Sequence, residues 1–170
     1  MRKPAAPKPK ASAVQSVGRC VCGAVSLEID VPAVWAWHDH SSASRHAQGA
    51  AYATYVGSWC SRFRILAGED HISRYEDPEL GTARSFCARC GTPLFYERAR
   101  SPKMVNIPRA LFAERTGREP RYHGGVAQMA DWAWRGEAMA PLKGYPGVMF
   151  VRARKAAPKR QPADDSLFEP

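Results

Sequence analysis

Two close pairs of cysteines constrain this chain more than any other feature of its sequence. Cys20 and Cys22 form the first pair, Cys87 and Cys90 form the second, and a glycine follows each pair directly. In an extended segment the side chains at i and i+2 point to the same side, so Cys20 and Cys22 can face one ion. In the second pair a C-x-x-C-G turn wraps the backbone around that ion, because Gly91 tolerates the backbone angles that such a turn needs.

Four thiolates are the ligand set of a structural zinc ion. They satisfy tetrahedral Zn²⁺ at Zn–S distances of about 2.3 Å, and the closed shell leaves no open position for chemistry. An iron atom in the same sulfur cage, or four unrelated buried thiols, are the alternatives. Zinc ribbons differ, since they use two C-x-x-C pairs separated by roughly 15–20 residues. We therefore expect one structural zinc ion, which joins segments 65 positions apart (Cys22 to Cys87) and contributes strongly to folding.

The length and composition are those of one soluble domain with extensions at both ends. The chain has 170 residues, of which 45% are hydrophobic and 10% aromatic, which is sufficient for the core of one domain. No apolar run approaches the roughly 20 residues needed to cross a bilayer, and the N-terminal segment lacks the apolar middle of a secretory signal. We expect a cytoplasmic protein without membrane contacts, whose thiols stay reduced and whose cysteine pairs bind metal rather than form disulfides.

The net charge of +9 lies mainly at the two ends of the chain. Residues 1–16 carry four basic and no acidic side chains, residues 151–170 carry five basic and three acidic ones, and residues 17–150 are left with +3. Both ends are poor in large apolar residues and contain several prolines, so we expect disordered basic tails. Such tails make weak, salt-dependent contacts with nucleic acid, but the sequence favours solubilising extensions over a dedicated nucleic-acid interface.

Residues 17–150 are predicted to fold as one mainly β domain. Short runs that alternate polar and apolar residues, or that are rich in β-branched and aromatic residues, are separated by Gly, Pro, Asp and Ser at intervals typical of an all-β fold. Helical patterning is scarce: residues 41–50 fit a short helix or an irregular loop, and residues 109–115 fit one or two helical turns. Strands are expected at residues 25–31, 51–56, 62–66, 71–76, 93–97 and 104–107, in a single-layer or sandwich-like arrangement.

The two cysteine motifs and their neighbours resemble the CENP-V/GFA family of glutathione-dependent formaldehyde-activating enzyme-like proteins. The matching segments are residues 18–25 (GRCVCGAV) and 84–94 (RSFCARCGTPL), and the similarity extends over roughly residues 17–135. Weaker landmarks lie at residues 68–75 and 123–132. The resemblance implies a β-tent-like fold of twisted antiparallel sheets around the four-cysteine zinc site. It also implies carbon–sulfur lyase activity on a glutathione–formaldehyde adduct, with glutathione or a related thiol adduct as the ligand.

Members of this family carry a second cysteine cluster, C-H-C-x-x-C-R, that holds the catalytic zinc ion, and this chain departs from it. The corresponding stretch is residues 39–45 (DHSSASR), in which the histidine and the arginine are kept but the three cysteines are replaced by Asp39, Ser41 and Ser44. A serine hydroxyl is neutral at pH 7 and is a poor zinc ligand compared with a thiolate. We therefore expect no tightly held second ion at these positions, which weakens or removes the metal-dependent reaction.

Histidines near this stretch leave one alternative open. His38 and His40 could project to one side of a strand and bind a substitute metal together with Asp39 or His46, although lone polar residues on a loop are usually just solvated. Arg45, the kept arginine, could contact a carboxylate of glutathione, or it could be an exposed structural residue. The sequence alone does not separate these alternatives.

Cys60 and four tryptophans are expected to be structural. Cys60 has no partner in the sequence, and a lone cysteine beside an aromatic residue is more often a small buried hydrophobe than a nucleophile. The tryptophans form two W-x-W pairs, each of which would place both rings on one face of a strand. Core packing, or a lid over the sheet, is favoured over a ligand pocket for Trp35, Trp37, Trp132 and Trp134.

Three functions are consistent with these features. The first is a carbon–sulfur lyase of the glutathione-dependent formaldehyde-activating type with a weakened or lost catalytic metal site. The second is a non-catalytic binding module that keeps the zinc-stabilised scaffold, and the three replaced cysteines favour it, because a shared fold does not by itself carry a shared activity. The third, a zinc-stabilised nucleic-acid binder, is disfavoured by the position of the positive charge in the tails. The sequence does not decide whether catalysis survives.

Overall fold

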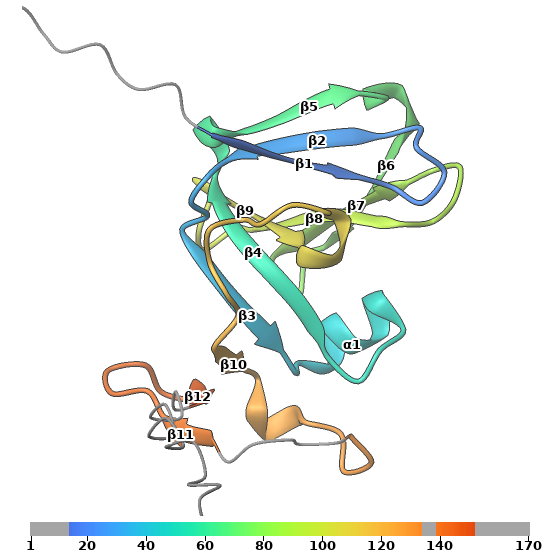
Figure 1. Ribbon diagram of the computed structural model, residues 1–170. Coiled ribbons are helices and arrows are strands. Elements are labelled where there is room, and N and C mark those ends of the chain that lie inside the picture. Colours follow the sequence, from blue (N-terminus) through green and yellow to red (C-terminus); the bar gives the residue numbers. More distant parts are fainter. Residues whose placement is uncertain (1–13, 134–138, 152–170) are drawn as a thin grey trace, which may run out of the picture.

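Two β-sheets make up the protein in the computed structural model, which describes residues 14–133 and 139–151 (Figure 1). The smaller sheet has the strand order β1-β2-β5, and its neighbouring strands are antiparallel. The prediction of a mainly β fold is therefore confirmed. The strands of the smaller sheet are β1 (Gln15–Arg19), β2 (Ser26–Asp30) and β5 (Phe63–Ala67).

The larger sheet contains nine strands within the described residues, in the order β11-β12-β10-β3-β4-β9-β8-β7-β6. Its strand pairs are antiparallel except that of β10 with β3, which is parallel and thus differs from the antiparallel arrangement expected. A parallel pair cannot be joined by a tight hairpin, and here a long stretch of chain separates the two strands. The strands are β3 (Trp35–Asp39), β4 (Ala53–Trp59), β6 (Ile72–Asp77), β7 (Thr82–Cys87), β8 (Pro93–Arg98), β9 (Met104–Pro108), β10 (Tyr122–Gly124), β11 (Met139–Pro141) and β12 (Met149–Val151).

All six predicted strand segments coincide with observed strands, namely β2, β4, β5, β6, β8 and β9. Residues 41–50 contain the helix α1 (Ser42–Gln48), but residues 109–115 provide only a short 3₁₀ turn at Arg109–Leu111. β1, β3, β7 and the three C-terminal strands were not among the predicted segments. β1 begins at Gln15 and β12 ends at Val151, so each extends slightly past the predicted domain limits; the rest of the predicted tails lies outside the described residues.

The main core lies between the two sheets. In β2 the side chains of Leu27 and Ile29 are fully buried, while the alternating Glu28 and Asp30 remain partly exposed and pair with Arg64 of β5. This alternation of period two is what one buried sheet face requires. Buried side chains of the larger sheet complete the same cluster, among them Val56, Leu94, Val105 and Ile107.

A second core cluster consists mainly of aromatic residues on the strands β3, β4 and β8. Trp37, Tyr55 and Tyr96 are buried there, and Trp35 packs against them and stacks on Tyr122 at a centroid distance of 4.5 Å. The expected packing role of the first tryptophan pair is confirmed. Trp132 instead is 70% exposed, and Trp134 lies outside the described residues.

Cys60 is exposed rather than buried as expected. It lies in a 3₁₀ turn after β4, where its thiol reaches only the Pro102 carbonyl oxygen at 3.8 Å. Cys60 is exposed because this turn lies at the surface. The local sequence does not encode that position. Among the described residues no helix is long and apolar enough to cross a membrane.

Candidate metal centre and adjoining cavity

The four predicted metal ligands meet at one end of the two sheets. Cys20 follows β1 directly and Cys22 lies in the next turn, whereas Cys87 ends β7 and Cys90 lies in the turn before β8. The Val21 backbone N–H donates to the Thr92 hydroxyl at 3.2 Å and so ties the two turns together. The site therefore joins the smaller sheet to the larger one.

The positions of the four sulfur atoms fit a single tetrahedral ion. All four Sγ atoms lie within 4.8 Å of one another. The separation is 3.5 Å between Cys20 and Cys22 and 3.8 Å between Cys22 and Cys87. A tetrahedron with metal–sulfur bonds of about 2.3 Å has sulfur–sulfur separations of about 3.8 Å. The donor set and its spacing thus match the expectation for a metal site in a four-cysteine cage.

Backbone groups support this sulfur cluster. The Val25 N–H donates to the Cys20 sulfur at 3.2 Å. In the second turn the Gly91 N–H donates to the Cys87 carbonyl oxygen at 2.8 Å, and Gly91 has the positive φ of 70° predicted for it. Only glycine adopts this conformation at little cost, so the turn depends on it.

The thiols of Cys22 and Cys90 differ in acidity because their surroundings differ. The side-chain and backbone hydrogen bonds of Thr92 lower the pKa of Cys90 to about 5. For Cys22 the backbone hydrogen bond of Ala24 lowers the pKa, but the neighbouring sulfurs of the cluster and burial together raise it to about 11. Several negative charges in so small a volume repel one another, and a divalent cation removes that repulsion.

Asp39, Ser41 and Ser44, the three positions expected to correspond to the second cysteine cluster, form a hydrogen-bonded network. The Asp39 carboxylate accepts from the Ser44 hydroxyl at 3.0 Å and from the Ser41 backbone N–H at 2.9 Å. The Ser41 hydroxyl in turn accepts from the Ser44 backbone N–H at 3.3 Å and so caps the N-terminus of α1. Asp39 and Ser44 are buried, with exposed fractions of 7% and 1%. The polar side-chain atoms of Asp39 and Ser44 are therefore occupied by hydrogen bonds within the protein.

Arg98 of β8 completes the surroundings of the buried carboxylate. Its guanidinium lies 3.8 Å from Asp39 and donates to the hydroxyl of Tyr96. The same guanidinium lies over the rings of Trp37 and Tyr96, at 5.9 and 5.1 Å from their centroids. A buried carboxylate that has both a cation and hydrogen-bond donors is stable without a metal ion.

The histidines of this region form a cluster on the other face of β3. His38 and His40 project to the same side, as considered from the sequence, but their partner is His123 of β10, whose Nδ1 lies 2.8 Å from His40 Nε2. Asp39 points to the opposite face, toward Ser44. His46 lies on α1 and lines a cavity instead. The substitute site of His38, Asp39, His40 and His46 is thus not assembled, and within the described ranges only the four cysteines group as metal ligands.

Burial keeps the histidine cluster neutral. Burial first, and then the neighbouring imidazoles, lower the pKa of His38 to about 4. Burial and His123 likewise lower the pKa of His40 to about 4. Burial also lowers the pKa of His123. His38 Nδ1 is paired with the Thr54 hydroxyl at 2.9 Å, whereas the buried Nδ1 of His40 has no partner among the described atoms.

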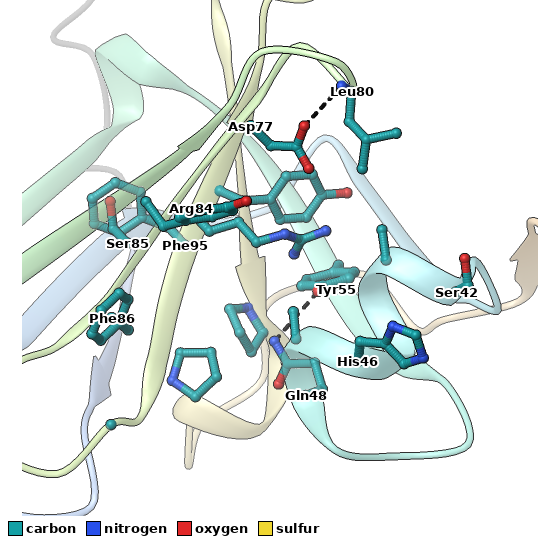
Figure 2. Close-up of a pocket in the computed structure, with 17 residues that line it drawn as sticks. Ser42, His46, Gln48, Tyr55, Asp77, Leu80, Arg84, Ser85, Phe86 and Phe95 are labelled. Atoms are coloured by element: carbon teal, nitrogen blue, oxygen red, sulfur yellow. Dashed lines mark hydrogen bonds between the residues drawn. The ribbon is translucent and has the colours of Figure 1, made fainter.

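A cavity of about 610 Å³ lies between α1 and the strands β6, β7 and β8 (Figure 2). Tyr55 and Tyr96 form part of its wall, and the Asp39 network adjoins Tyr96 through Arg98. Gly91 of the second cysteine turn also lines the cavity. The space therefore lies between the four-cysteine centre and the altered second cluster, and it is large enough for a small-molecule ligand.

Arg84 is the cation of this cavity. Figure 2 shows its side chain extending from β7 above Tyr55, whose hydroxyl accepts a hydrogen bond from Gln48 at 3.3 Å. Arg45, the arginine singled out from the sequence, is not one of the lining residues. Its charge acts on His40, whose pKa it helps to lower.

Sequence reasoning missed three residues that shape this region. His123 and Arg84 lie within segments that resemble the family but have no role assigned by the sequence, and no motif in the sequence points to Arg98. His123 reaches the site through the parallel pairing of β10 with β3, whereas β7 and β8, which carry Arg84 and Arg98, are placed beside it by the strand order of the larger sheet. The one available signal was the position of Arg84 three residues before Cys87 in the matching segment.

Comparisons with known proteins agree with this architecture. A family model with the description "Glutathione-dependent formaldehyde-activating enzyme" matches residues 15–128. Among solved structures, the chain is similar to a crystal structure of a Rhodobacter sphaeroides protein from a structural genomics programme, with 22% sequence identity and a TM-score of 0.50. That similarity covers 58% of this chain and 89% of the other. At this level of identity it shows a likeness of fold alone.

Proposed function

The chain belongs to the glutathione-dependent formaldehyde-activating enzyme (GFA) family, and we propose that it is a non-catalytic member that binds a glutathione-type thiol or thiol adduct. In this proposal Cys20, Cys22, Cys87 and Cys90 hold one structural zinc ion, and no second ion is bound. None of the five cysteines forms a disulfide, which suits the reducing cytoplasm expected from the sequence.

The hydrogen bonds around Asp39 are the observation that carries this proposal. A metal site at the second cluster needs ligand atoms with free lone pairs that converge on one point. Here the Asp39 carboxylate already accepts from Ser44 and Ser41 and faces Arg98. Binding a cation there would require breaking these contacts and bringing positive charge beside a guanidinium. Two hydroxyls and one carboxylate offer little to offset that cost.

The cavity supports the binding part of the proposal. It is formed by α1 and the β6–β8 strands, next to the altered cluster, and it combines apolar walls with a few polar groups. Such a combination is typical of a small-molecule site. A tripeptide thiol provides carboxylates, amides and a thiol, and the cavity presents a guanidinium, an amide and hydroxyls from Arg84, Gln48, Tyr55 and Ser85.

Isothermal titration calorimetry with reduced glutathione and with S-methylglutathione tests this proposal on the zinc-loaded protein. We expect saturable binding of both ligands at millimolar concentration or below, because the interaction does not need metal coordination by the thiol. Binding should be unchanged when zinc is added in excess of one equivalent. An absence of binding at millimolar ligand, or binding that appears only with a second equivalent of zinc, would contradict it.

Carbon–sulfur lyase activity is the second candidate, and the family description favours it. The relevant reaction joins the glutathione thiol to formaldehyde. Exchange spectroscopy by NMR measures its rate with and without protein, and the binding proposal predicts no acceleration. Acceleration that is lost in Asp39→Asn, in a variant that remains folded, would establish the enzyme instead. The matched control is Asp70→Asn, because Asp70 lies in the turn before β6 and its side chain is 80% exposed.

A further inference from the structure

We propose that Arg84 makes the cavity a carboxylate-binding site, in which a ligand carboxylate pairs with the guanidinium and the rest of the ligand lies along the aromatic wall. This inference deepens the proposed function and rests on it only for the identity of the ligand as a glutathione-type molecule. The carboxylate selectivity itself follows from the residues around Arg84.

The Arg84 side chain is held in place by its neighbours. On β7 it is directly paired with Tyr75 of β6 on one side and with Tyr96 of β8 on the other. All three residues line the cavity, and the guanidinium lies 5.0 Å from the centroid of the Tyr96 ring. A guanidinium positioned over an aromatic face in this way is pre-organised, so less side-chain entropy is lost when a ligand binds.

The charge of Arg84 is not neutralised by the part of the chain that the structure describes. Other arginines on the same sheet do have carboxylate partners: Arg74 pairs with Glu97 and Arg98 approaches Asp39. No carboxylate oxygen of the described residues lies within 4.0 Å of Arg84. A partly buried guanidinium without a counter-ion favours an anionic ligand, since its charge is only partly screened there.

Asp77 at the rim argues for a monoanion rather than a phosphate. This carboxylate also lines the cavity, and one of its oxygens accepts from the Leu80 backbone N–H at 3.0 Å (Figure 2). A group with two negative charges would be repelled by Asp77, whereas a single carboxylate matches the planar fork of one guanidinium. The remaining walls include Phe86, Phe95 and Pro93, which suit apolar or amide portions of the ligand.

Calorimetry on Arg84→Gln, Arg84→Lys and wild-type protein tests the inference with two probes, reduced glutathione and benzoate. A charge-assisted hydrogen bond contributes about 1.5–3 kcal/mol, so the Kd of each probe should rise roughly tenfold or more in Arg84→Gln. Arg84→Lys keeps the charge but loses the fork, and its Kd should be intermediate. Arg100→Gln is the matched control, because Arg100 is exposed in the β8–β9 turn and does not line the cavity. Circular dichroism verifies that each variant is folded.

Glutathione with both of its carboxylates blocked as ethyl esters gives a second readout. We expect the ester to bind wild-type protein more weakly than glutathione, and the two to bind Arg84→Gln equally. Glutathione binding that is equal in wild-type and Arg84→Gln protein would overturn this inference and leave the proposed function standing. Benzoate binding that Arg84→Gln loses, with no glutathione binding, would support the carboxylate site and overturn the glutathione proposal. If neither probe binds the wild-type protein, both fall.

Discussion

The Asp39 carboxylate accepts a hydrogen bond from the Ser44 hydroxyl at 3.0 Å, across the junction of β3 and α1. By the family resemblance these two positions correspond to cysteines of the second cluster, and here their side chains bond directly to each other. This bond keeps strand and helix together without an ion. It also occupies the carboxylate and the hydroxyl that a metal ion would need as ligands.

Replacing Ser44 with alanine tests how much this bond contributes. Ser44→Ala leaves a buried carboxylate with one donor fewer, and hydrogen bonds to charged groups contribute about 1.5–3 kcal/mol. We expect the free energy of unfolding, measured in urea with zinc present, to fall by about 2 kcal/mol. Ser42→Ala is the control, because Ser42 is exposed on the same helix and its hydroxyl has no bond in the described structure. Equal effects of the two substitutions would contradict the account.

Removing one ligand of the four-cysteine centre should cost far more. Cys87 is fully buried and belongs to the four-cysteine group that links the two sheets, so under the proposed zinc assignment Cys87→Ser should lose zinc and several kcal/mol of stability. Cys60→Ser changes an exposed thiol outside the cluster and should be nearly neutral. Measurements of zinc content and of thermal unfolding on both variants test this prediction. The wild-type protein is measured with and without a chelator for comparison. A Cys87→Ser protein that remains folded and retains its zinc would refute the structural assignment.

The histidine cluster predicts a loss of stability in mild acid. His38 and His40 have pKa values of about 4 in the folded state, below the ordinary value of 6.5. Between pH 4 and pH 6.5 the unfolded chain binds more protons at these histidines than the folded chain does. The free energy of unfolding therefore falls as the pH drops from 6.5 toward 4, and these histidines do not change it above pH 6.5. The loss should be on the order of 1 kcal/mol per histidine.

Urea unfolding between pH 7 and pH 5 measures this dependence. His123→Gln removes one imidazole from the cluster and relieves repulsion on the other two, so its stability should fall less steeply with acid than that of the wild type. His46→Gln, on the exposed side of α1, should keep the wild-type slope. Identical slopes for all three proteins would show that the cluster does not control the acid response.

A close approach of backbones makes Gly68 indispensable. It has a φ of 76° in the turn between β5 and β6, and a Cβ atom there would lie 2.0 Å from the Ala24 carbonyl oxygen. Gly68→Ala should therefore cost about 3 kcal/mol or more, since the backbone must shift as well as adopt a strained angle. Gly81 also has a positive φ, but a Cβ atom there would make only an ordinary contact at 3.5 Å. Gly81→Ala should therefore cost about 1 kcal/mol. Thermal unfolding distinguishes the two; equal losses would contradict this argument.

Local patterning could predict strands but not their partners. β2 was predictable because Leu27 and Ile29 alternate with charged residues. β1 was missed because its buried positions are Ser16 and Gly18, which carry no apolar signal. β10 has only three residues and is stabilised by parallel pairing with β3, a tertiary interaction that no short window of sequence contains.

The candidate site, like the fold, was only partly predictable from the sequence. Cys20, Cys22, Cys87 and Cys90 could be grouped from the sequence because residue type and spacing suffice to define a sulfur cage. The role of His123 could not, because it depends on the parallel pairing of β10 with β3, and that of Arg98 could not, because it depends on a side-chain approach to the distant Asp39. The substitutions at Asp39 and Ser44 suggested a lost metal site, but only the structure shows that they bond to each other.

The metal content of the purified protein tests the central claim most directly. Elemental analysis of wild-type protein, dialysed against excess zinc and then zinc-free buffer, should give about one zinc ion per chain. The variant D39C/S41C/S44C, which restores three thiols at the second cluster, should give about two and confirms that the measurement detects a second site. Two zinc ions in the wild-type protein would contradict the account of the Asp39 network, and none would contradict the four-cysteine centre.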